Sequence, residues 1–403
     1  MTTYREIFGI REFRVLFVSR LFAMVGVVVS SLALGTVMYD ETGSPLLTAL
    51  SLFGGPLVQL VTARYLLAAS DLLRPRTAMT LTAGVTTTTA ALQLLPGLTW
   101  EMRFVILAAG YVTLAATSGT VVSLLSDIVP QEAFVLARAT MNITVGGMQV
   151  IGYGVGALVL AALSPSWLFG IAAVTGVVAG AVVRLGIGEH PPRATGKVVE
   201  RSRRVNRELL RSPIVLPLFL MMWVPNGLIV GCEALFIPYA GEDAGYLFAA
   251  GAVGMLSGDV VIGRFLSEEL RDRLIVPLRV VLALPFLVFP LSLPMPVVVV
   301  LVTVSALAYP ASLPMQERLV WHTRQDVRGQ AFGLSSTGLM AGQGVGAVLA
   351  GGTAQLLEGP RAAGWAMAVM AVLSLLITAA LAPALRRSAK PMPGFGRADP
   401  RKG

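Results

Sequence analysis

Few side chains in this sequence could do chemistry, because most of its charged residues stand between long apolar segments. Arg20, Arg64 and Glu233 lie inside such segments, and Asp259 and Arg279 lie nearer the segment ends. No histidine or cysteine cluster suits a metal ion, no glycine-rich loop with a lysine suits a phosphate, and no serine has an evident base. We therefore expect no enzyme, no cofactor and no metal site. The chemistry open to this chain is the binding of ions and small molecules.

Glu233 is the acid that lies deepest in an apolar segment. It precedes Tyr239, the outer end of its segment, by six residues, which in a helix places it about 9 Å below that end. A charge in hydrocarbon needs a partner or a cavity. We expect Glu233 to bind a proton or a cationic substrate. The alternative is an acid at the mouth of a cavity, or one paired with a neighbour.

Arg20 could hold an anionic substrate, since it lies about 12 Å along its segment from Glu12. Arg64 is placed similarly in the next segment. A long arginine side chain can instead extend its guanidinium to the inner surface of the membrane. For Arg64 we favour that interpretation or a local ion pair. For Arg20, binding of an anionic substrate and extension to the inner surface both stay open.

Asn226 is the preferred polar contact for a substrate near the middle of the membrane. It lies in Pro225–Gly227, where proline and glycine predict an interrupted helix. Gly26 has a comparable depth in the first half of the chain, and matching interruptions mark midplane binding sites in transporters. A plain proline kink that serves packing is the alternative.

Three further amides stand in apolar segments. Asn142 and Gln149 are seven residues apart and so share a helix face, and Gln343 is the approximate repeat mate of Gln149. They could line a substrate pathway or bridge neighbouring helices, which is the commoner use of buried amides in membranes. The glycines every fourth residue from Gly338 to Gly346 indicate close helix packing.

The amino-acid composition is that of a membrane protein. Of 403 residues, 55% are apolar and 13% charged, whereas a soluble domain carries about a quarter charged residues. The mean hydropathy is +0.76. The net charge of +9 comes from arginines at segment ends, in a central linker and in the tail. An inner face against anionic lipid explains them, and we expect no nucleic-acid partner.

The apolar segments predict an all-α membrane protein of twelve transmembrane helices in two pseudo-symmetric six-helix bundles. We expect an N-terminal bundle in residues 1–187, a basic cytoplasmic linker in 188–212, a C-terminal bundle in 213–385 and a cytoplasmic tail in 386–403. The spans fall near Phe13–Met38, Leu46–Ala69, Thr77–Leu95, Phe104–Leu125, Phe134–Leu163, a sixth ending at Arg184, then Ile214–Tyr239, Ala244–Gly263, Leu274–Leu291, Pro296–Met315, Gly329–Leu357 and Ala362–Leu385.

Charge placement orients the chain. With both termini in the cytoplasm, Arg103 and Arg361 are the basic residues left in outer loops, and the reversed orientation would violate the positive-inside rule. The first segment is long and lacks a cleavage site, so it is expected to be a retained span. The prediction is a multi-pass protein of the plasma (inner) membrane, functioning as a monomer.

Twelve spans, a basic middle linker and repeated halves resemble the major facilitator superfamily. An offset of 192 residues places Gly152–Gly154 over Gly344–Gly346. The superfamily's motif between spans 2 and 3, Gly-x-x-x-Asp-Arg-x-Gly-Arg-Arg, is similar to the stretch from Leu67 to Arg76, in which the acid and the final arginine match and the glycines and the first arginine do not.

This resemblance implies an inner gate of ion pairs. When the inner side is closed, Arg74 or Arg76 would pair with Asp127, and Arg264 would pair with Glu317. The acid of the motif is Asp71. Ordinary interfacial charges are the alternative.

The segments Asp127–Glu132 and Asp326–Ala331 resemble the bacterial exporter branch that includes drug and siderophore efflux proteins. That resemblance implies proton-coupled efflux of a small amphipathic molecule by alternating access, although the arginine common in span 4 of proton antiporters is absent. The partners expected are a small-molecule substrate, protons and the lipid bilayer. An importer or facilitator is the first alternative, and a non-transporting sensor or scaffold with this fold is the second.

Overall fold

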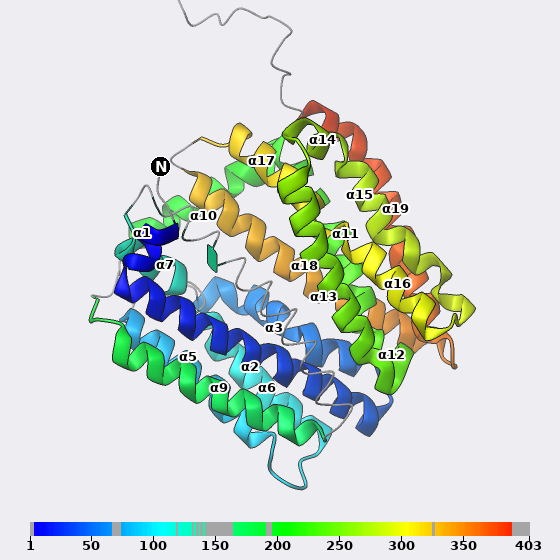
Figure 1. The fold of residues 1–403 in the computed structure, drawn as a ribbon, viewed down its shortest axis with the longest axis horizontal. Coiled ribbons are helices and arrows are strands. Elements are labelled where there is room, and N and C mark those ends of the chain that lie inside the picture. The colour runs from blue at the N-terminus through cyan, green and yellow to red at the C-terminus, as the bar shows by residue number, and fades with distance from the viewer. Residues whose placement is uncertain are drawn as a thin grey trace, which may run out of the picture.

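The computed structural model describes residues 4–66, 74–117, 120–130, 133, 137, 140–141, 164–190, 196–324 and 327–388. Its regular elements in those ranges are all helices (Figure 1). The predicted fifth span, Phe134–Leu163, lies almost entirely outside the described residues. Each of the other predicted spans is present as one helix or as consecutive helical pieces.

The N-terminal half begins with a short helix and continues with the first spans. Proline stands at the first helical position of α5 and α9, where its missing N–H costs nothing, and Gly43 ends α2 in the left-handed conformation that glycine adopts easily. The helices are α1 (Tyr4–Gly9), α2 (Arg11–Thr42), α3 (Pro45–Leu66), α5 (Pro75–Leu92), α6 (Trp100–Thr117), α7 (Thr120–Ile128) and α9 (Pro165–Gly186).

The C-terminal half follows the linker helix α10 (Gly196–Arg211) and is more broken. Its helices are α11 (Val215–Ala234), α12 (Phe236–Ala240), η1 (Gly241–Asp243), α13 (Ala244–Val260), η2 (Val261–Phe265), α14 (Glu268–Arg273), α15 (Ile275–Ala283), η3 (Leu284–Leu291), α16 (Met295–Ala306), η4 (Tyr309–Ala311), α17 (Ser312–His322), α18 (Arg328–Leu357) and α19 (Ala362–Arg387).

Five stretches of the described chain are long and apolar enough to cross a membrane by length and composition alone. The other spans are shorter, carry more polar residues or are interrupted. The five are Arg11–Thr42, Pro165–Gly186, Val215–Val260, Met295–Leu319 and Ala362–Arg387.

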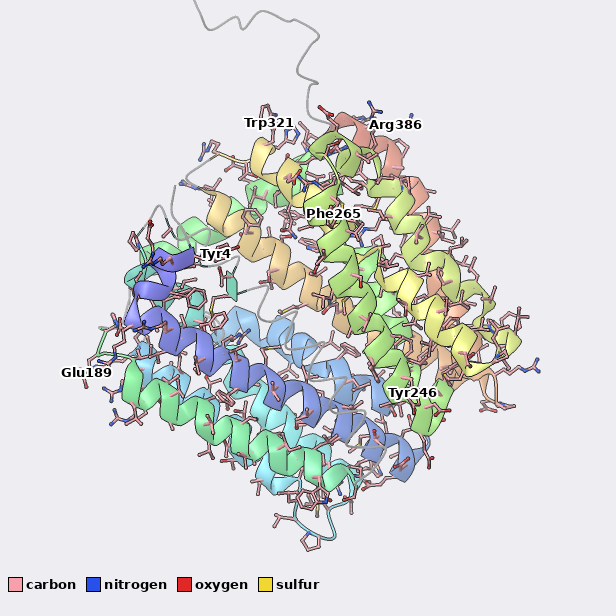
Figure 2. All side chains as sticks on the ribbon, viewed as in Figure 1. Tyr4, Glu189, Tyr246, Phe265, Trp321 and Arg386 are labelled. Carbon is pink, nitrogen blue, oxygen red and sulfur yellow. The ribbon has the colours of Figure 1, made fainter. Side chains whose placement is uncertain are left out.

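Two opposite ends of the helix bundle can be distinguished. The hairpin end carries the connections at residues 43–44, 93–99, 241–243 and 358–361, and the linker end carries α10 and α14. Exposed aromatic rings stand at both: Tyr246 at the hairpin end, and Tyr4 and Trp321 at the linker end (Figure 2). Trp365, in the first turn of α19 after the connection at 358–361, is also exposed. Such rings are typical of the two membrane–water interfaces.

The two halves share one hydrophobic core at the hairpin end and have separate cores at the linker end. The shared core contains Leu34 and Leu52 of the N-terminal half together with Leu235 and Phe286 of the C-terminal half. At the linker end, one core lies within the N-terminal half and another within the C-terminal half and α10. Helices α3 and α18 accordingly converge toward α12 and diverge toward α10 and α1 (Figure 1). The bundles are therefore joined at the hairpin end.

Contacts between the halves at the hairpin end are close. Ser44 Oγ donates to Gln355 Oε1 at 2.8 Å, and the Tyr39 hydroxyl donates to the Pro238 carbonyl at 3.3 Å. Gly351 of α18 lies against the first turns of α3, where an added Cβ would be 3.0 Å from Ala49 Cβ. Helices approach this closely where small residues face each other.

Helices α11 and α18 pack through glycine, which confirms the packing predicted for Gly338–Gly346. A Cβ on Gly227 would overlap the Gly342 carbonyl, and a Cβ on Gly346 would overlap the Gly227 carbonyl. Within a membrane, helix association depends on such van der Waals contact between backbones, because lipid tails are as apolar as the side chains.

The predicted interruption at Pro225–Gly227 is wrong, because α11 continues through Pro225 to Ala234. Span 1 is also continuous through Gly26. The break in span 7 falls at Leu235, whose N–H turns back to the Cys232 carbonyl at 3.1 Å. Pro238 explains this position, since proline offers no N–H to the carbonyl four residues earlier, that of Ala234, and its ring clashes there.

Prolines break spans 9 and 10 in the same way. Span 9 changes from α15 to the 3₁₀ helix η3 at Leu284, next to Pro285. Span 10 is interrupted between Ala306 and Ser312, around Pro310. Irregular backbone at membrane depth is tolerated where protein or a cavity surrounds it.

The linker helix α10 packs against the C-terminal half. Its apolar face places Val205 and Leu209 in the core at the linker end, and Gln330 of α18 donates to Asn206 at 2.9 Å. Arg204, Arg207 and Glu208 are exposed on the other face. The predicted domain boundaries on either side of this helix stay predictions.

Candidate functional site

Glu233 and Tyr309 form a hydrogen-bonded pair inside the C-terminal half. The Tyr309 hydroxyl donates to Glu233 Oε1 at 2.6 Å, and both side chains are partly buried. Glu233 is the second-last residue of α11, and Tyr309 opens the 3₁₀ turn η4. Both therefore stand beside a helix break, where the interrupted backbone of spans 7 and 10 brings an acid and a phenol together.

Arg279 is a buried cation close to this pair. It lies on α15 and is 1% exposed, the largest side chain among the fully buried ones. Its guanidinium interacts electrostatically with Tyr309, while its Nε and Nη1 have no hydrogen-bond partner in the described part of the chain. Tyr309 thus has electrostatic interactions with both a carboxylate, Glu233, and a guanidinium, Arg279.

A buried guanidinium is costly, because removing a charge from water requires a counter-charge or several hydrogen bonds. Such groups persist in membrane proteins where they serve ion or substrate binding. The arrangement of Glu233, Tyr309 and Arg279 can exchange a proton at the carboxylate. The arginine can compensate the negative charge when that proton leaves.

Asn226 and Gln343 are hydrogen-bonded to each other, with Gln343 Nε2 donating to Asn226 Oδ1 at 3.2 Å. They link α11 to α18, which is the helix-bridging geometry that the sequence left open as an alternative. Asn226 is 7% exposed and Gln343 is partly exposed. Asn142 and Gln149 lie outside the described residues.

Arg20 is partly buried on α2, in the half of that helix nearer the linker end. It forms no hydrogen bond or ion pair with any residue that the structure describes. Arg64 lies in α3, but its side chain is outside the described part. A cation in a membrane span whose described neighbours do not pair with it is a candidate contact for an anionic group of a substrate or lipid.

The described residues of the predicted inner gate lie at the linker end. Arg74 forms an exposed ion pair with Glu189 at 3.6 Å, and Arg76 Nη2 donates to the Arg184 carbonyl at 2.6 Å. Asp127 is exposed near the end of α7. Asp71 lies outside the described residues.

In the C-terminal half, Glu317 pairs with Arg271 at 2.9 Å, and the side chain of Arg264 is outside the described part. The predicted pairing of Arg264 with Glu317 concerns a state closed at this end. Among the described residues the two halves have separate cores at the linker end, so the gate pairing stays a prediction.

Arg318 ties the linker end of the C-terminal half together, although the sequence did not single it out. It is 6% exposed and binds Asp272 through two parallel hydrogen bonds of 2.6 and 2.7 Å. It also donates to the Leu385 carbonyl at 2.6 Å. Helices α14, α17 and α19 thereby meet at one guanidinium.

Tyr309 was missed by the sequence analysis, and Arg279 was noted as lying near a segment end. A signal for Tyr309 is its position directly before Pro310, which marks a break in an apolar span. No local pattern distinguishes Arg279 from an interfacial arginine. Its burial follows from the packing of α15 against helices distant in sequence.

The comparisons with known proteins agree with this architecture. The Major Facilitator Superfamily profile matches residues 16–320, about three quarters of the chain. The chain belongs to the Major Facilitator Superfamily. No curated protein sequence matches it.

Solved structures of the superfamily share the fold across nearly the whole chain. A POT family transporter in complex with a thioalcohol-conjugated peptide superposes with a TM-score of 0.71 at 11% identity, over 94% of this chain and 97% of that one. A bacterial homologue of the human lysosomal transporter Spinster, inward-facing and unoccupied, gives 0.66 at 12% identity, over 94% and 98%.

The nucleoside transporter NupG gives a TM-score of 0.66 at 14% identity, over 93% of this chain and 99% of that chain. Likenesses at such identities show the fold alone. They confirm the predicted all-α membrane fold of two six-helix bundles, and this superfamily member is a multi-pass membrane protein with the transporter fold. Its hairpin end is the closed end in the conformation described here.

Proposed function

We propose that this superfamily member is a proton-coupled secondary transporter that exports a small amphipathic molecule, acting as a monomer in the plasma membrane. The observation that carries the proposal is the asymmetry of packing among the described residues: one core joins both halves at the hairpin end, and each half has its own core at the linker end. A transporter that rocks between two states has this form when it is open on one side. The resemblance to the exporter branch supports the direction.

The linker end is assigned to the cytoplasm. Helix α10 carries exposed Arg204 and Arg207 there, and the described chain begins and ends at the same end, with Ile7 and Ser388 both packed into it. Basic loops stay on the cytoplasmic side. The conformation is then open to the cytoplasm, ready to load a substrate for export.

Glu233 is the proposed proton site. Its carboxylate lies in a span and accepts one strong hydrogen bond from Tyr309, and the buried Arg279 interacts electrostatically with that phenol. A carboxylate that gains or loses a proton changes its attraction to the nearby cation. Since α11, η4 and α15 meet at this point, that change is coupled to the packing of spans 7, 9 and 10. Arg20 and Asn226 are the proposed contacts for the substrate.

The experiment reconstitutes the protein in liposomes with a pH gradient and a fluorescent amphipathic cation or anion, after a susceptibility and accumulation screen in cells with and without the gene. Glu233→Gln keeps the shape and removes the charge. We expect it to abolish uptake driven by the pH gradient while exchange of labelled for unlabelled substrate continues. Asp259→Asn, an exposed acid on α13, is the matched control and should retain coupling.

Three outcomes contradict the proposal. A Glu233→Gln protein that still accumulates substrate with an unchanged dependence on pH removes Glu233 from coupling. Movement of substrate with the proton gradient, toward the linker side, makes the protein an importer. Absence of any flux with every substrate of the screen would favour a sensor or scaffold.

A further inference from the structure

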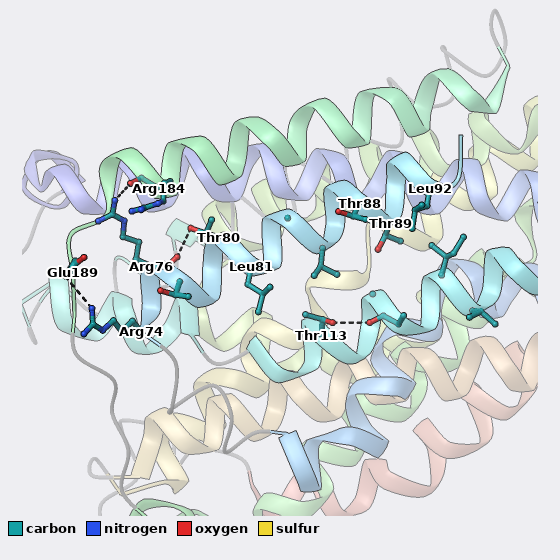
Figure 3. Close-up of a pocket in the computed structure, with 17 residues that line it drawn as sticks. Arg74, Arg76, Thr80, Leu81, Thr88, Thr89, Leu92, Thr113, Arg184 and Glu189 are labelled. Atoms are coloured by element: carbon teal, nitrogen blue, oxygen red, sulfur yellow. Dashed lines mark hydrogen bonds and ion pairs between the residues drawn. The ribbon is translucent and has the colours of Figure 1, made fainter. Parts of the chain in front are cut away.

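A groove of about 1010 Å³ runs along the N-terminal half between α5 and α6 (Figure 3). It lies away from the contact of α3 with α18 that joins the halves. The groove begins at Arg74 and Arg76, at the start of α5, and continues to Leu92 at the other end of that helix. Neither the proposed proton site nor the proposed substrate contacts line it.

The walls of the groove consist of apolar side chains with threonine hydroxyl groups between them. Their larger apolar members are Leu81, Val85, Leu92, Val105 and Ile106, and their hydroxyl members are Thr77, Thr80, Thr88, Thr89 and Thr113. Val105 is 69% exposed and Leu81 is 45% exposed. Side chains of this kind on a membrane span face lipid tails, so the groove is open toward the bilayer.

The linker end of the groove is positively charged. Arg74, Arg76 and Arg184 line it together with one acid, Glu189. The ion pair of Arg74 with Glu189 is long, 3.6 Å, and both side chains are more than half exposed, so it is weak. Among the described residues that line this end, three guanidinium groups and one carboxylate give a net positive charge.

One of these arginines is incompletely satisfied. Arg76 Nη2 donates to the Arg184 carbonyl, but Arg76 Nε is buried and has no hydrogen-bond partner among the described residues. The first turn of α5 also lacks a side-chain cap on its N–H groups. A buried donor beside a helix start whose backbone N–H groups no side chain caps suits an anionic oxygen.

Space for a chain continues beyond these donors. A Cβ on Gly84 would meet no atom within 4 Å. Gly84 lies ten residues from Arg74, about 15 Å along a helix, and half of a bilayer's hydrocarbon core is also about 15 Å thick. The anionic end and the open apolar part are therefore separated as the headgroup and tail of one leaflet are.

We propose that this groove binds one anionic phospholipid of the linker-end leaflet. Its phosphate contacts Arg76 with Arg74 and Arg184 beside it, and one acyl chain lies along α5 and α6 past Gly84. The bound lipid connects spans 3, 4 and 6 of the N-terminal bundle. A transported amphipathic anion would share this chemistry, and the experiment distinguishes the two.

The experiment measures lipid binding to the full-length protein by native mass spectrometry, with phosphatidylglycerol and phosphatidylcholine as the two probes. We expect the wild type to retain phosphatidylglycerol selectively. The double variant Arg76→Gln with Arg184→Gln should lower its affinity by roughly thirtyfold, because each arginine near an anionic headgroup contributes about a factor of five. Affinity for phosphatidylcholine should not change.

Two further variants separate a built site from general attraction. Gly84→Leu fills the groove and leaves every charge in place, so it should also abolish selective binding. Arg204→Gln with Arg207→Gln removes two exposed charges from α10 at the same end, and should leave selective binding within twofold of the wild type. If the first double variant does not fold, Gly84→Leu decides alone, since a Cβ at this position meets no atom within 4 Å.

Equal retention of the two lipids by the wild type overturns the proposal. So does unchanged phosphatidylglycerol binding in Gly84→Leu. An equal loss of phosphatidylglycerol affinity in the α10 variant would show that general surface charge, and not the groove, attracts the lipid. Competition between phosphatidylglycerol and an exported anionic substrate would assign the groove to the substrate instead.

Discussion

A disulfide between the two halves tests the closed hairpin end. In the structure a Cβ on Gly351 would lie 3.0 Å from Ala49 Cβ, whereas the Cβ atoms of a disulfide are about 3.8 Å apart. The helices therefore need to separate by about 0.8 Å. The same movement relieves the contact of the new Cβ with Leu46 Cα, which is 2.8 Å in the structure.

The expected result is efficient cross-linking of Ala49→Cys with Gly351→Cys under mild oxidation. The native Cys232 is the single cysteine of the sequence and is 0% exposed, so it does not compete. With a protease site inserted between Glu189 and Gly196, cleaved halves should stay together on a gel without reductant and separate when reductant is added.

Transport should fall in proportion to the cross-linked fraction and return on reduction, because alternating access requires this end to open. The pair Ala49→Cys with Gly352→Cys is the matched control. Gly352 is the next residue on α18, and a Cβ there meets no atom within 4 Å, so this pair should not cross-link.

Failure of the Ala49–Gly351 pair to cross-link refutes the close packing of α3 and α18 at the hairpin end. Full transport by the cross-linked protein refutes the reasoning that this end must open during the cycle. Equal cross-linking of the control pair would show that the helices slide freely against each other.

Three further predictions follow from particular contacts. Gly346→Ala should destabilise the protein by about 1–3 kcal/mol, since its Cβ overlaps α11. Gly352→Ala should instead stabilise the protein by about 0.4–1 kcal/mol. Thermal unfolding in detergent measures both variants, and equal effects would contradict the packing of α11 against α18. Asp272→Ala leaves the guanidinium of Arg318 without its counter-charge and should cost about 3 kcal/mol in the same assay; a neutral effect would show that the pair is dispensable. Tyr309→Phe removes the 2.6 Å hydrogen bond to a carboxylate, so gradient-driven transport should fall roughly ten- to a hundredfold, and a wild-type rate would exclude the phenol from coupling.

The sequence determined the fold class because hydropathy and charge are local properties. Long apolar runs between arginine-containing loops require helices in a membrane, whatever they pack against. Glycines at a spacing of four predicted the contact that Gly227 and Gly346 make. Glu233 was identifiable as the acid inside a span, since a charge in hydrocarbon is expensive wherever it lies.

The tertiary structure decided what surrounds each of these residues. Tyr309 is 76 residues from Glu233, and no local pattern relates them. Proline in an apolar segment predicts a helix break, but only the structure shows which proline causes one: α11 continues through Pro225 and ends before Pro238. A missing hydrogen bond is tolerated where neighbouring helices support the backbone, and only the assembled bundle provides that support.

The burial of Arg279 and the groove between α5 and α6 have the same origin. In sequence Arg279 resembles other arginines near a span end, yet the packing of α15 excludes it from solvent. The groove joins Arg76 to residues of a different span that meets α5 after one hairpin. Local sequence fixes which segments cross the membrane, and contacts between segments far apart in the chain fix which of their side chains meet.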